Sequence, residues 1–155
     1  MPEPLSSAEL AEARQQHIGR LLLQASRAFN ARSIGRLQRR GHADLSLVHA
    51  NLLPHLDVAE GTRMTVLAER AGITKQAVGQ LVAELEQAGY VERQPDPLDR
   101  RAQRICFTSR GQAYLLDALL VKRELEAEYR ALLGDADWER LRVSLGAIIE
   151  AGAGD

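Results

Sequence analysis

Two short helical patterns joined by one glycine, with two strand-like segments directly after them, most constrain how this 155-residue chain folds. The apolar positions of VLAERA and KQAVGQLVAELEQA recur at helical steps, and Gly72 between them suits a left-handed turn. Thr65 and Thr74 are the expected N-caps of the two helices, and the second helix should end at Gly89. Its expected buried stripe comprises Val78, Leu81, Val82 and Leu85.

The segments after Gly89 predict a β-hairpin. YVER and AQRICFT alternate in the manner of strands, and PDPLD between them has the composition of a turn. Thr108 or Ser109 then caps a long helix to about Leu133, and Gly134 separates it from a last helix that begins at Asp135.

The N-terminal part predicts one long and one shorter helix. The long helix covers about Ser7 to Arg39, and Ser6 with Glu9 resembles a capping box. Asp44 is the expected cap of the shorter helix, which runs to about Leu53 before Pro54 and should bury Leu45, Val48 and Leu52 on one side. A short extended piece is expected at Arg63 and Met64.

These elements predict a mainly α fold with a small β-hairpin wing, in which dimerisation helices flank a winged helix-turn-helix. We divide the chain into an N-terminal dimerisation helix over 1–43, a DNA-binding lobe over 44–110 and C-terminal dimerisation helices over 111–155. The apolar stripes of the two ends are expected to pack against each other and against a second copy, which predicts a homodimer.

Charge and composition narrow the classes of function. With 20 Lys+Arg and 21 Asp+Glu the chain is nearly neutral, so it does not coat nucleic acid, yet residues 93–110 gather five arginines and two acids. No apolar run has the roughly 20 residues of a membrane helix. The N-terminus does not resemble a secretory signal, and the single cysteine fits a reducing cytoplasm.

The second helix of the motif carries the side chains suited to reading DNA. Its exposed N-terminal half is the part that enters a major groove in such modules. Glutamine can pair with adenine and lysine with guanine or phosphate, which points to Thr74, Lys75, Gln76 and Gln80. Arginines at a hairpin tip suit a narrow minor groove. The alternative is that Arg93, Arg100, Arg101 and Arg104 are solvated surface charges, some paired with Asp96 and Asp99; the preceding helix-turn-helix favours the DNA-binding interpretation.

The stretch TVLAERAGITKQAVGQLVAELEQAGYVERQPDPLDRRAQRICFTSRG resembles the winged helix-turn-helix of the MarR family of bacterial transcription regulators. The similarity is densest over 62–116. The resemblance implies a homodimer on a pseudo-palindromic operator, with Arg100 or Arg101 in the minor groove and Asp99 orienting the wing by ion pairing. Arg63 completes the expected DNA-binding set. A small-molecule or redox signal would be received between the DNA-binding lobe and the dimerisation helices.

Gly79 departs from the family pattern, because similar proteins usually carry serine or another polar residue at this point of the recognition helix. Glycine costs roughly 1 kcal/mol against alanine in a helix. Either the backbone approaches DNA closely there, or the base preference is altered.

The histidines and the cysteine each allow two interpretations. His42, His49 and His55 lack the i,i+4 spacing of a zinc pair and are expected in an effector cleft or as hydrogen-bonded core residues, with no metal or cofactor. Cys106 is either a redox sensor, its pKa lowered by Arg104 and Arg110, or a structural residue of the second wing strand. The structural role is favoured.

No catalytic constellation is apparent, so an enzyme is not expected. The sequence predicts a cytoplasmic, nucleoid-associated bacterial regulator, a repressor that binds double-stranded DNA as a homodimer and is released by a small-molecule effector. The alternative is a winged-helix interaction or sensor protein that no longer binds DNA specifically.

Overall fold

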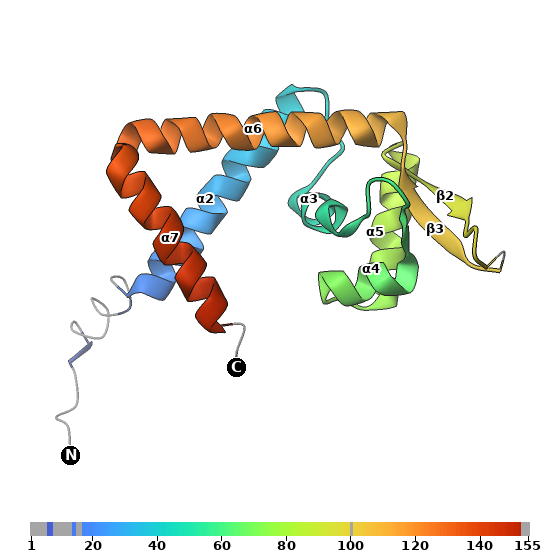
Figure 1. Ribbon diagram of the computed structural model, residues 1–155, viewed down its shortest axis with the longest axis horizontal. Helices are drawn as coiled ribbons and strands as arrows, with labels where there is room; N and C mark the ends of the chain where they lie inside the picture. The colour runs from blue at the N-terminus through green and yellow to red at the C-terminus, as the bar shows by residue number, and fades with distance from the viewer. Residues whose placement is uncertain (1–5, 8–13, 15–16, 100, 153–155) are drawn as a thin grey trace, which may run out of the picture.

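The computed structural model describes residues 6–7, 14, 17–99 and 101–152. The helices are α2 (Ile18–Arg39), α3 (Leu47–Leu52), α4 (Met64–Ala71), α5 (Lys75–Gln87), α6 (Ser109–Leu133) and α7 (Asp135–Gly152), with a 3-10 turn η1 (Leu53–His55) after α3. The strands are β1 (Thr62–Arg63), β2 (Val91–Pro95) and β3 (Gln103–Phe107). Figure 1 shows α6 as a long helix with α7 folded back from one end and the hairpin at the other.

The three strands form one antiparallel sheet in the order β1-β3-β2. The hairpin register pairs Val91 with Phe107 and Pro95 with Gln103, while Thr62 of β1 pairs with Ile105. The predicted mainly α fold with a small hairpin wing is therefore confirmed.

One core joins the lobe to the flanking helices. Tyr90 and Ile105 from the lobe are buried together with Leu37 of α2 and Leu125 of α6. Burying one such side chain stabilises a fold by about 1.5–3 kcal/mol. The rest of the buried apolar set comes mainly from α3 to β3: Leu45, Leu52, Leu53, Leu56, Leu67, Ala68, Val78, Val82, Leu85, Val91, Phe107, Tyr114 and Val121.

A row of ion pairs fixes α2 against α6. Arg36 lies 2.5 Å from Glu128 and 3.3 Å from Glu124, and Arg40 lies 3.3 Å from Asp117. Arg32 also pairs with Glu128, and its guanidinium stacks 5.3 Å from the Tyr129 ring centroid. Because these groups are partly exposed, the row sets the register of the helices more than it adds to stability.

Two predicted helix starts are wrong, and the predicted first helix is not continuous. Ser7 and Arg14 are helical, but α2 begins anew at Ile18, because His17 has an extended backbone and its Nδ1 accepts from the Arg20 N–H; the proposed capping partner Glu9 lies outside the described residues. Ser46 caps α3 in place of Asp44. The N-cap of α4 is Arg63 in place of Thr65, since the helix follows β1 without an intervening turn.

The predicted apolar face of α3 is also only partly right. Leu45 and Leu52 are buried, whereas Val48 is 58% exposed. Starting the helix after Ser46 turns Val48 outward and His49 inward, and His49 is 7% exposed.

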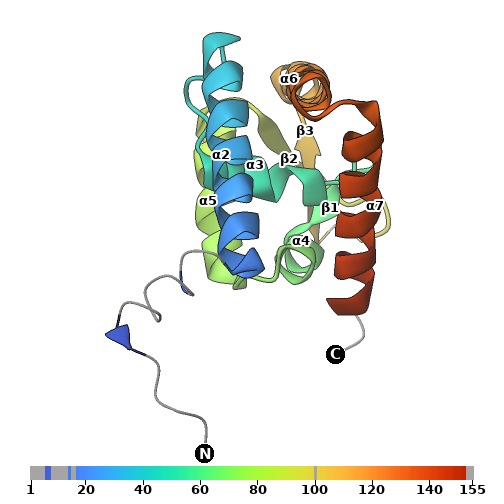
Figure 2. The same ribbon diagram turned by 90° about the vertical axis from the view of Figure 1, so that its left-hand side faces the viewer.

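Both ends of the chain expose apolar side chains. None of the residues of α7 is buried, and in Figure 2 α7 descends from α6 on the side opposite α2. In the part of the chain that the structure describes, no helix is long and apolar enough to cross a membrane.

Candidate nucleic-acid interface

The turn between α4 and α5 has the predicted geometry. Gly72 adopts a left-handed conformation with φ of 66°, and Thr74 accepts a hydrogen bond from the Ala77 N–H at 3.2 Å. Val78, Val82 and Leu85 are at most 1% exposed and Leu81 is half-buried, so the predicted stripe of α5 is confirmed.

The opposite face of α5 is open to solvent. Thr74, Lys75, Gln76 and Gln80 are all exposed at or near the N-terminal half of this helix. Within the described residues the Lys75 ammonium has no ion-pair partner, and a helix N-terminus itself attracts anions. This face therefore offers a free cation, a hydroxyl and two carboxamides to one ligand.

A buried carboxylate organises the base of the wing. Asp96 is 1% exposed, and its Oδ2 lies 2.5 Å from Arg63 Nε and 3.1 Å from Arg104 Nε. Its Oδ1 accepts from the Leu98 N–H at 2.8 Å. These contacts, that with Arg63 first, hold the pKa of Asp96 well below its usual range. Asp96 thus ties the turn to both β1 and β3.

Asp99, which the resemblance implied would orient the wing by ion pairing, contacts the backbone of the turn. Its Oδ1 accepts from the Arg101 backbone N–H at 3.0 Å, and in the described part of the chain Asp96 is the wing acid that pairs with arginine side chains. Sequence reasoning allowed a pairing of Asp96 with the arginines of the segment, as Arg104 shows, but not its contact with Arg63. Its position between two prolines hid a role that depends on Arg63, 33 residues earlier.

Most arginines of the 93–110 segment serve the fold. Arg93 pairs with Glu86 at 3.0 Å, and Arg104 also pairs with Glu60 at 3.4 Å. Arg110 pairs with Asp44 at 2.8 Å and stacks 4.4 Å from the Tyr90 ring centroid. The guanidinium of Arg101 has no partner among the residues described, and Arg100 lies outside them.

The three histidines do not meet in one pocket. His42 is buried, with Nδ1 3.0 Å from the Tyr90 hydroxyl and Nε2 3.0 Å from Asp117. His49 lies 2.9 Å from Glu84 on α5. Only His55 lines the cleft between α2, α3 and α6.

That cleft has a volume of about 510 Å³. Its walls are mainly apolar, and the polar side chains among them include Lys122, His55, Ser33 and two asparagines. The lining residues are Phe29, Asn30, Ser33, Ile34, Leu37, Leu47, Ala50, Asn51, Pro54, His55, Tyr114, Leu115, Ala118, Leu119 and Lys122. Mostly apolar walls with a few polar groups are typical of small-molecule sites.

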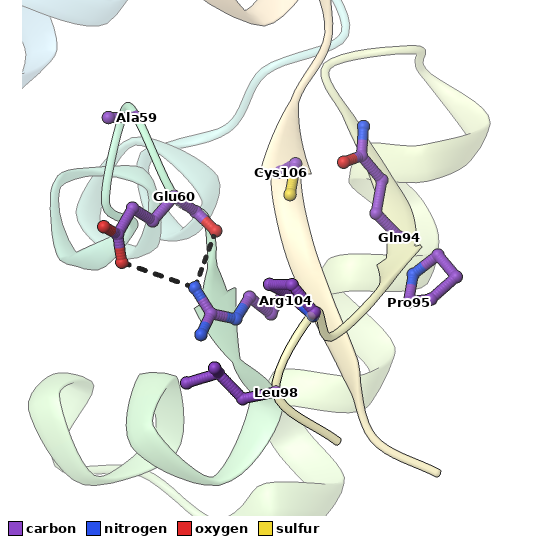
Figure 3. Close-up of a pocket in the computed structure, with 8 residues that line it drawn as sticks. Ala59, Glu60, Gln94, Pro95, Leu98, Arg104 and Cys106 are labelled. Atoms are coloured by element: carbon purple, nitrogen blue, oxygen red, sulfur yellow. Dashed lines mark hydrogen bonds and ion pairs between the residues drawn. The ribbon is translucent and has the colours of Figure 1, made fainter. Parts of the chain in front are cut away.

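Cys106 lies in a second hollow, beside Glu60 and Arg104 on the outer face of the wing (Figure 3). Burial raises the pKa of its thiol, Glu92 raises it further, and Arg104 offsets this only in part. The predicted lowering is therefore wrong, because Arg110 is directed to Asp44 and Tyr90 instead. A thiol that stays protonated is a poor nucleophile.

Comparisons with known proteins agree with this geometry. Residues 43–102 match the MarR family. The transcriptional regulator HosA of Escherichia coli O111:H- is 28% identical over 79 residues, which are 51% of this chain and 58% of that relative, so little more than half of its length is matched.

Two solved structures extend the likeness over the length of the chain. Rv1404 of Mycobacterium tuberculosis has a TM-score of 0.71 at 23% identity, covering 97% of both chains. CouR of Rhodococcus jostii RHA1, solved with p-coumaroyl-CoA, has a TM-score of 0.66 at 27% identity and covers 86% of this chain and 92% of its own.

Proposed function

We propose that this chain is a MarR-family winged helix-turn-helix regulator and that it represses transcription by binding duplex DNA as a homodimer. We further propose that a small-molecule effector releases the protein from the DNA. The observation that carries it is the exposed face of α5, where Thr74, Lys75, Gln76 and Gln80 lie together and open to solvent.

The proposed contacts divide between two grooves. The N-terminal half of α5 enters the major groove, where a glutamine carboxamide matched to adenine contributes about 1–3 kcal/mol of discrimination. The wing approaches the minor groove with Arg101 and Arg100, and Asp99 supports the turn. Figure 1 shows α4, α5 and the hairpin on the same side of α6, as one surface for a duplex requires. In this scheme Arg63 does not contact DNA directly. Its guanidinium pairs with Asp96 and so supports the wing.

The homodimer is proposed from the uncovered helices. Leu21 of α2, Leu132 of α6 and Ile149 of α7 are between 50% and 78% exposed, and a second copy would cover them. A two-fold dimer presents two copies of α5, which reach successive major-groove faces when they are about 34 Å apart.

The α2–α3–α6 cleft is the proposed effector site. Its apolar walls and single lysine suit an apolar organic anion, and CouR, 27% identical, has been solved with p-coumaroyl-CoA. Of the predicted pocket histidines only His55 is retained in this proposal. Binding would shift the population of dimer conformations and with it the separation of the two α5 helices.

The test starts with selection of bound sequences from random duplex DNA, followed by titration of the selected duplex at several salt concentrations. We expect a palindromic consensus and an affinity that falls steeply with salt, because bound phosphates release counterions. Arg101→Ala should weaken binding and reduce the salt slope by roughly one unit.

Arg140→Ala on α7 is the matched control, since it removes the same charge from an exposed site outside the lobe. Equal effects of the two variants would remove the wing from the proposal. Selection that enriches no sequence would support the alternative function, an interaction or sensor protein that keeps the fold without reading DNA.

A further inference from the structure

We propose that His49 and Glu84 are positioning residues that orient the Gln80 carboxamide for base reading. They make α3 a contributor to sequence specificity although α3 itself does not reach the DNA. The inference rests on the proposed function, and it concerns two residues outside the proposed groove contacts.

The anchor is a buried histidine with both ring nitrogens in use. The His49 side chain is 9% exposed, its Nδ1 accepts from the Ser46 backbone N–H at 3.3 Å, and its Nε2 lies 2.9 Å from Glu84 Oε2. Ser46 Oγ also lies 3.1 Å from Nδ1. Because a carboxylate can only accept, the ring nitrogen that faces it, Nε2, carries a hydrogen and donates it to Glu84. The contact with Ser46 at the start of α3 therefore holds the His49 ring in place, and the Nε2–H of that ring holds the Glu84 carboxylate.

Glu84 passes this constraint along α5. Its second oxygen, Oε1, accepts from Gln80 Nε2 at 3.3 Å, one helical turn earlier. An exposed pair of this spacing is weakly ordered by itself. Here the buried His49 ring on α3 holds Glu84 in place, so the Gln80 amide that donates to Glu84 has a defined orientation.

The orientation has a consequence for recognition. A carboxamide carries two N–H groups and one oxygen. When the N–H that points away from the oxygen is given to Glu84, the oxygen and the other N–H remain side by side. That donor–acceptor pair matches N6–H and N7 of adenine. Without Glu84 the amide can rotate and present other arrangements, which would relax the preference.

An acidic residue is unexpected on a helix face proposed to contact DNA, and Glu84 lies on such a face. A carboxylate 46% exposed on the DNA-facing helix repels phosphate, which lowers affinity for every sequence. A role in orienting Gln80 explains why a carboxylate is present at this position. Glu84 lowers the affinity for all DNA sequences but increases the discrimination among bases.

The experiment compares base discrimination among variants of the full chain, using the duplex selected by the wild-type protein. Gln80→Ala first identifies the base pair whose preference depends on Gln80. Glu84→Ala and His49→Phe are then expected to lower discrimination at that base pair by about 3- to 10-fold, part of what one bidentate contact provides. His49→Gln, which keeps a donor, should restore much of it. Combining Gln80→Ala with Glu84→Ala should lower discrimination no further than Gln80→Ala does.

Glu86→Ala is the charge-matched control, because Glu86 lies on the same helix but pairs with Arg93. It should leave discrimination at the Gln80 base pair unchanged. Glu84 is exposed, so Glu84→Ala keeps the test valid if the His49 variants fold poorly.

Discrimination that survives in Glu84→Ala, or a loss of affinity that is equal for all sequences, overturns the inference while leaving the proposed function intact. A Gln80→Ala variant with an unchanged consensus overturns it too. Failure of the wild-type protein to select any sequence defeats the proposed function instead.

Discussion

Asp96 is the residue on which the geometry of the wing depends. It is nearly inaccessible to solvent and accepts from a backbone N–H while pairing with Arg63 and Arg104. Removing its charge would leave Arg63 and Arg104 without their shared counterion, and Arg104, whose side chain is mostly buried, would lose the nearer of its two acidic partners. Loss of a partner from a buried ion pair is destabilising.

The first prediction concerns Asp96→Asn and pH. The folded-state pKa of Asp96 is lowered, so its contribution to stability is fully present above the unfolded value of about 3.9 and is lost as the pH falls through the folded value. We expect wild type to be more stable than Asp96→Asn by a constant margin at neutral pH, and this margin should narrow below about pH 4. Urea unfolding at several pH values measures it. A margin that widens in acid would contradict the assignment.

The second prediction concerns Gly79, where an added methyl group would meet no atom of the protein within 4 Å. Gly79→Ala should stabilise the free protein by about 0.5–1 kcal/mol, because alanine favours the helix. We also expect it to weaken DNA binding several-fold, since the new methyl group would stand on the face proposed to enter the groove.

Gly35→Ala is the control for Gly79→Ala. Its methyl group would meet only the end of the Arg39 side chain, at 3.7 Å, on a helix outside the lobe. It should give a similar gain in stability with unchanged DNA affinity. If Gly79→Ala also binds DNA like wild type, close backbone approach is not the reason for glycine at this position.

Among elements, the junction between the hairpin and α6 is the most tightly specified. Thr108 donates to the Gly89 carbonyl at 2.6 Å and accepts from the Gly111 N–H at 3.1 Å. Its backbone N–H also donates to the Tyr90 carbonyl at 3.1 Å. One residue therefore caps α6 and ties it to the end of the recognition helix.

The third prediction follows from this junction. Thr108→Ala should lower the free energy of unfolding by about 1–2 kcal/mol, because it removes a helix cap. Thr108→Ser keeps the hydroxyl and should lose only a few tenths of a kcal/mol, roughly the difference between these two caps. Equilibrium urea unfolding compares both with wild type, and equal losses for the two variants would show that the methyl group matters more than the cap.

The success of sequence reasoning at this scale depended on local chemistry. The caps Thr74 and Thr108 and the left-handed Gly72 were predictable because their partners lie within a few residues. Asp44 also has the side chain of a cap, but it pairs with Arg110, 66 residues away, and Ser46 takes its place. The same limit applies to the site. The exposed face of α5 follows from its helical periodicity, whereas which arginines are free depends on tertiary partners such as Glu86 and Asp96.

Helix α3 contacts both the proposed effector cleft and helix α5. Leu47, Ala50 and Asn51 line the cleft, while His49 on the same helix holds Glu84 of α5. A ligand that displaces α3 would therefore act on the recognition helix through a direct contact. The proposed effector cleft and the face of α5 proposed to contact DNA therefore share this six-residue helix.

On the scale of the whole molecule, burial is unevenly distributed. The lobe and the adjoining parts of α2 and α6 contain the core, whereas α7 exposes Leu141, Val143, Ile148 and Ile149. Apolar side chains gathered on one element at the end of a fold are typical of a surface that another chain covers.

The last prediction tests that surface. Ile148 and Ile149 are 52% and 70% exposed, and in a homodimer we expect them to be buried at the interface. Ile148→Asp combined with Ile149→Asp would place two carboxylates there, and a buried unpaired charge is strongly unfavourable. Sedimentation should then change from the dimer to the 17.1 kDa monomer, and DNA affinity should fall because one half-site alone is bound. Circular dichroism should show an intact helical lobe, since α7 contributes no buried residue to it.

Leu98→Asp is the control, because it introduces the same charge at an 84% exposed position of the wing turn; this variant should remain dimeric. A double variant that still sediments as a dimer would assign the interface to α2 and α6 without α7.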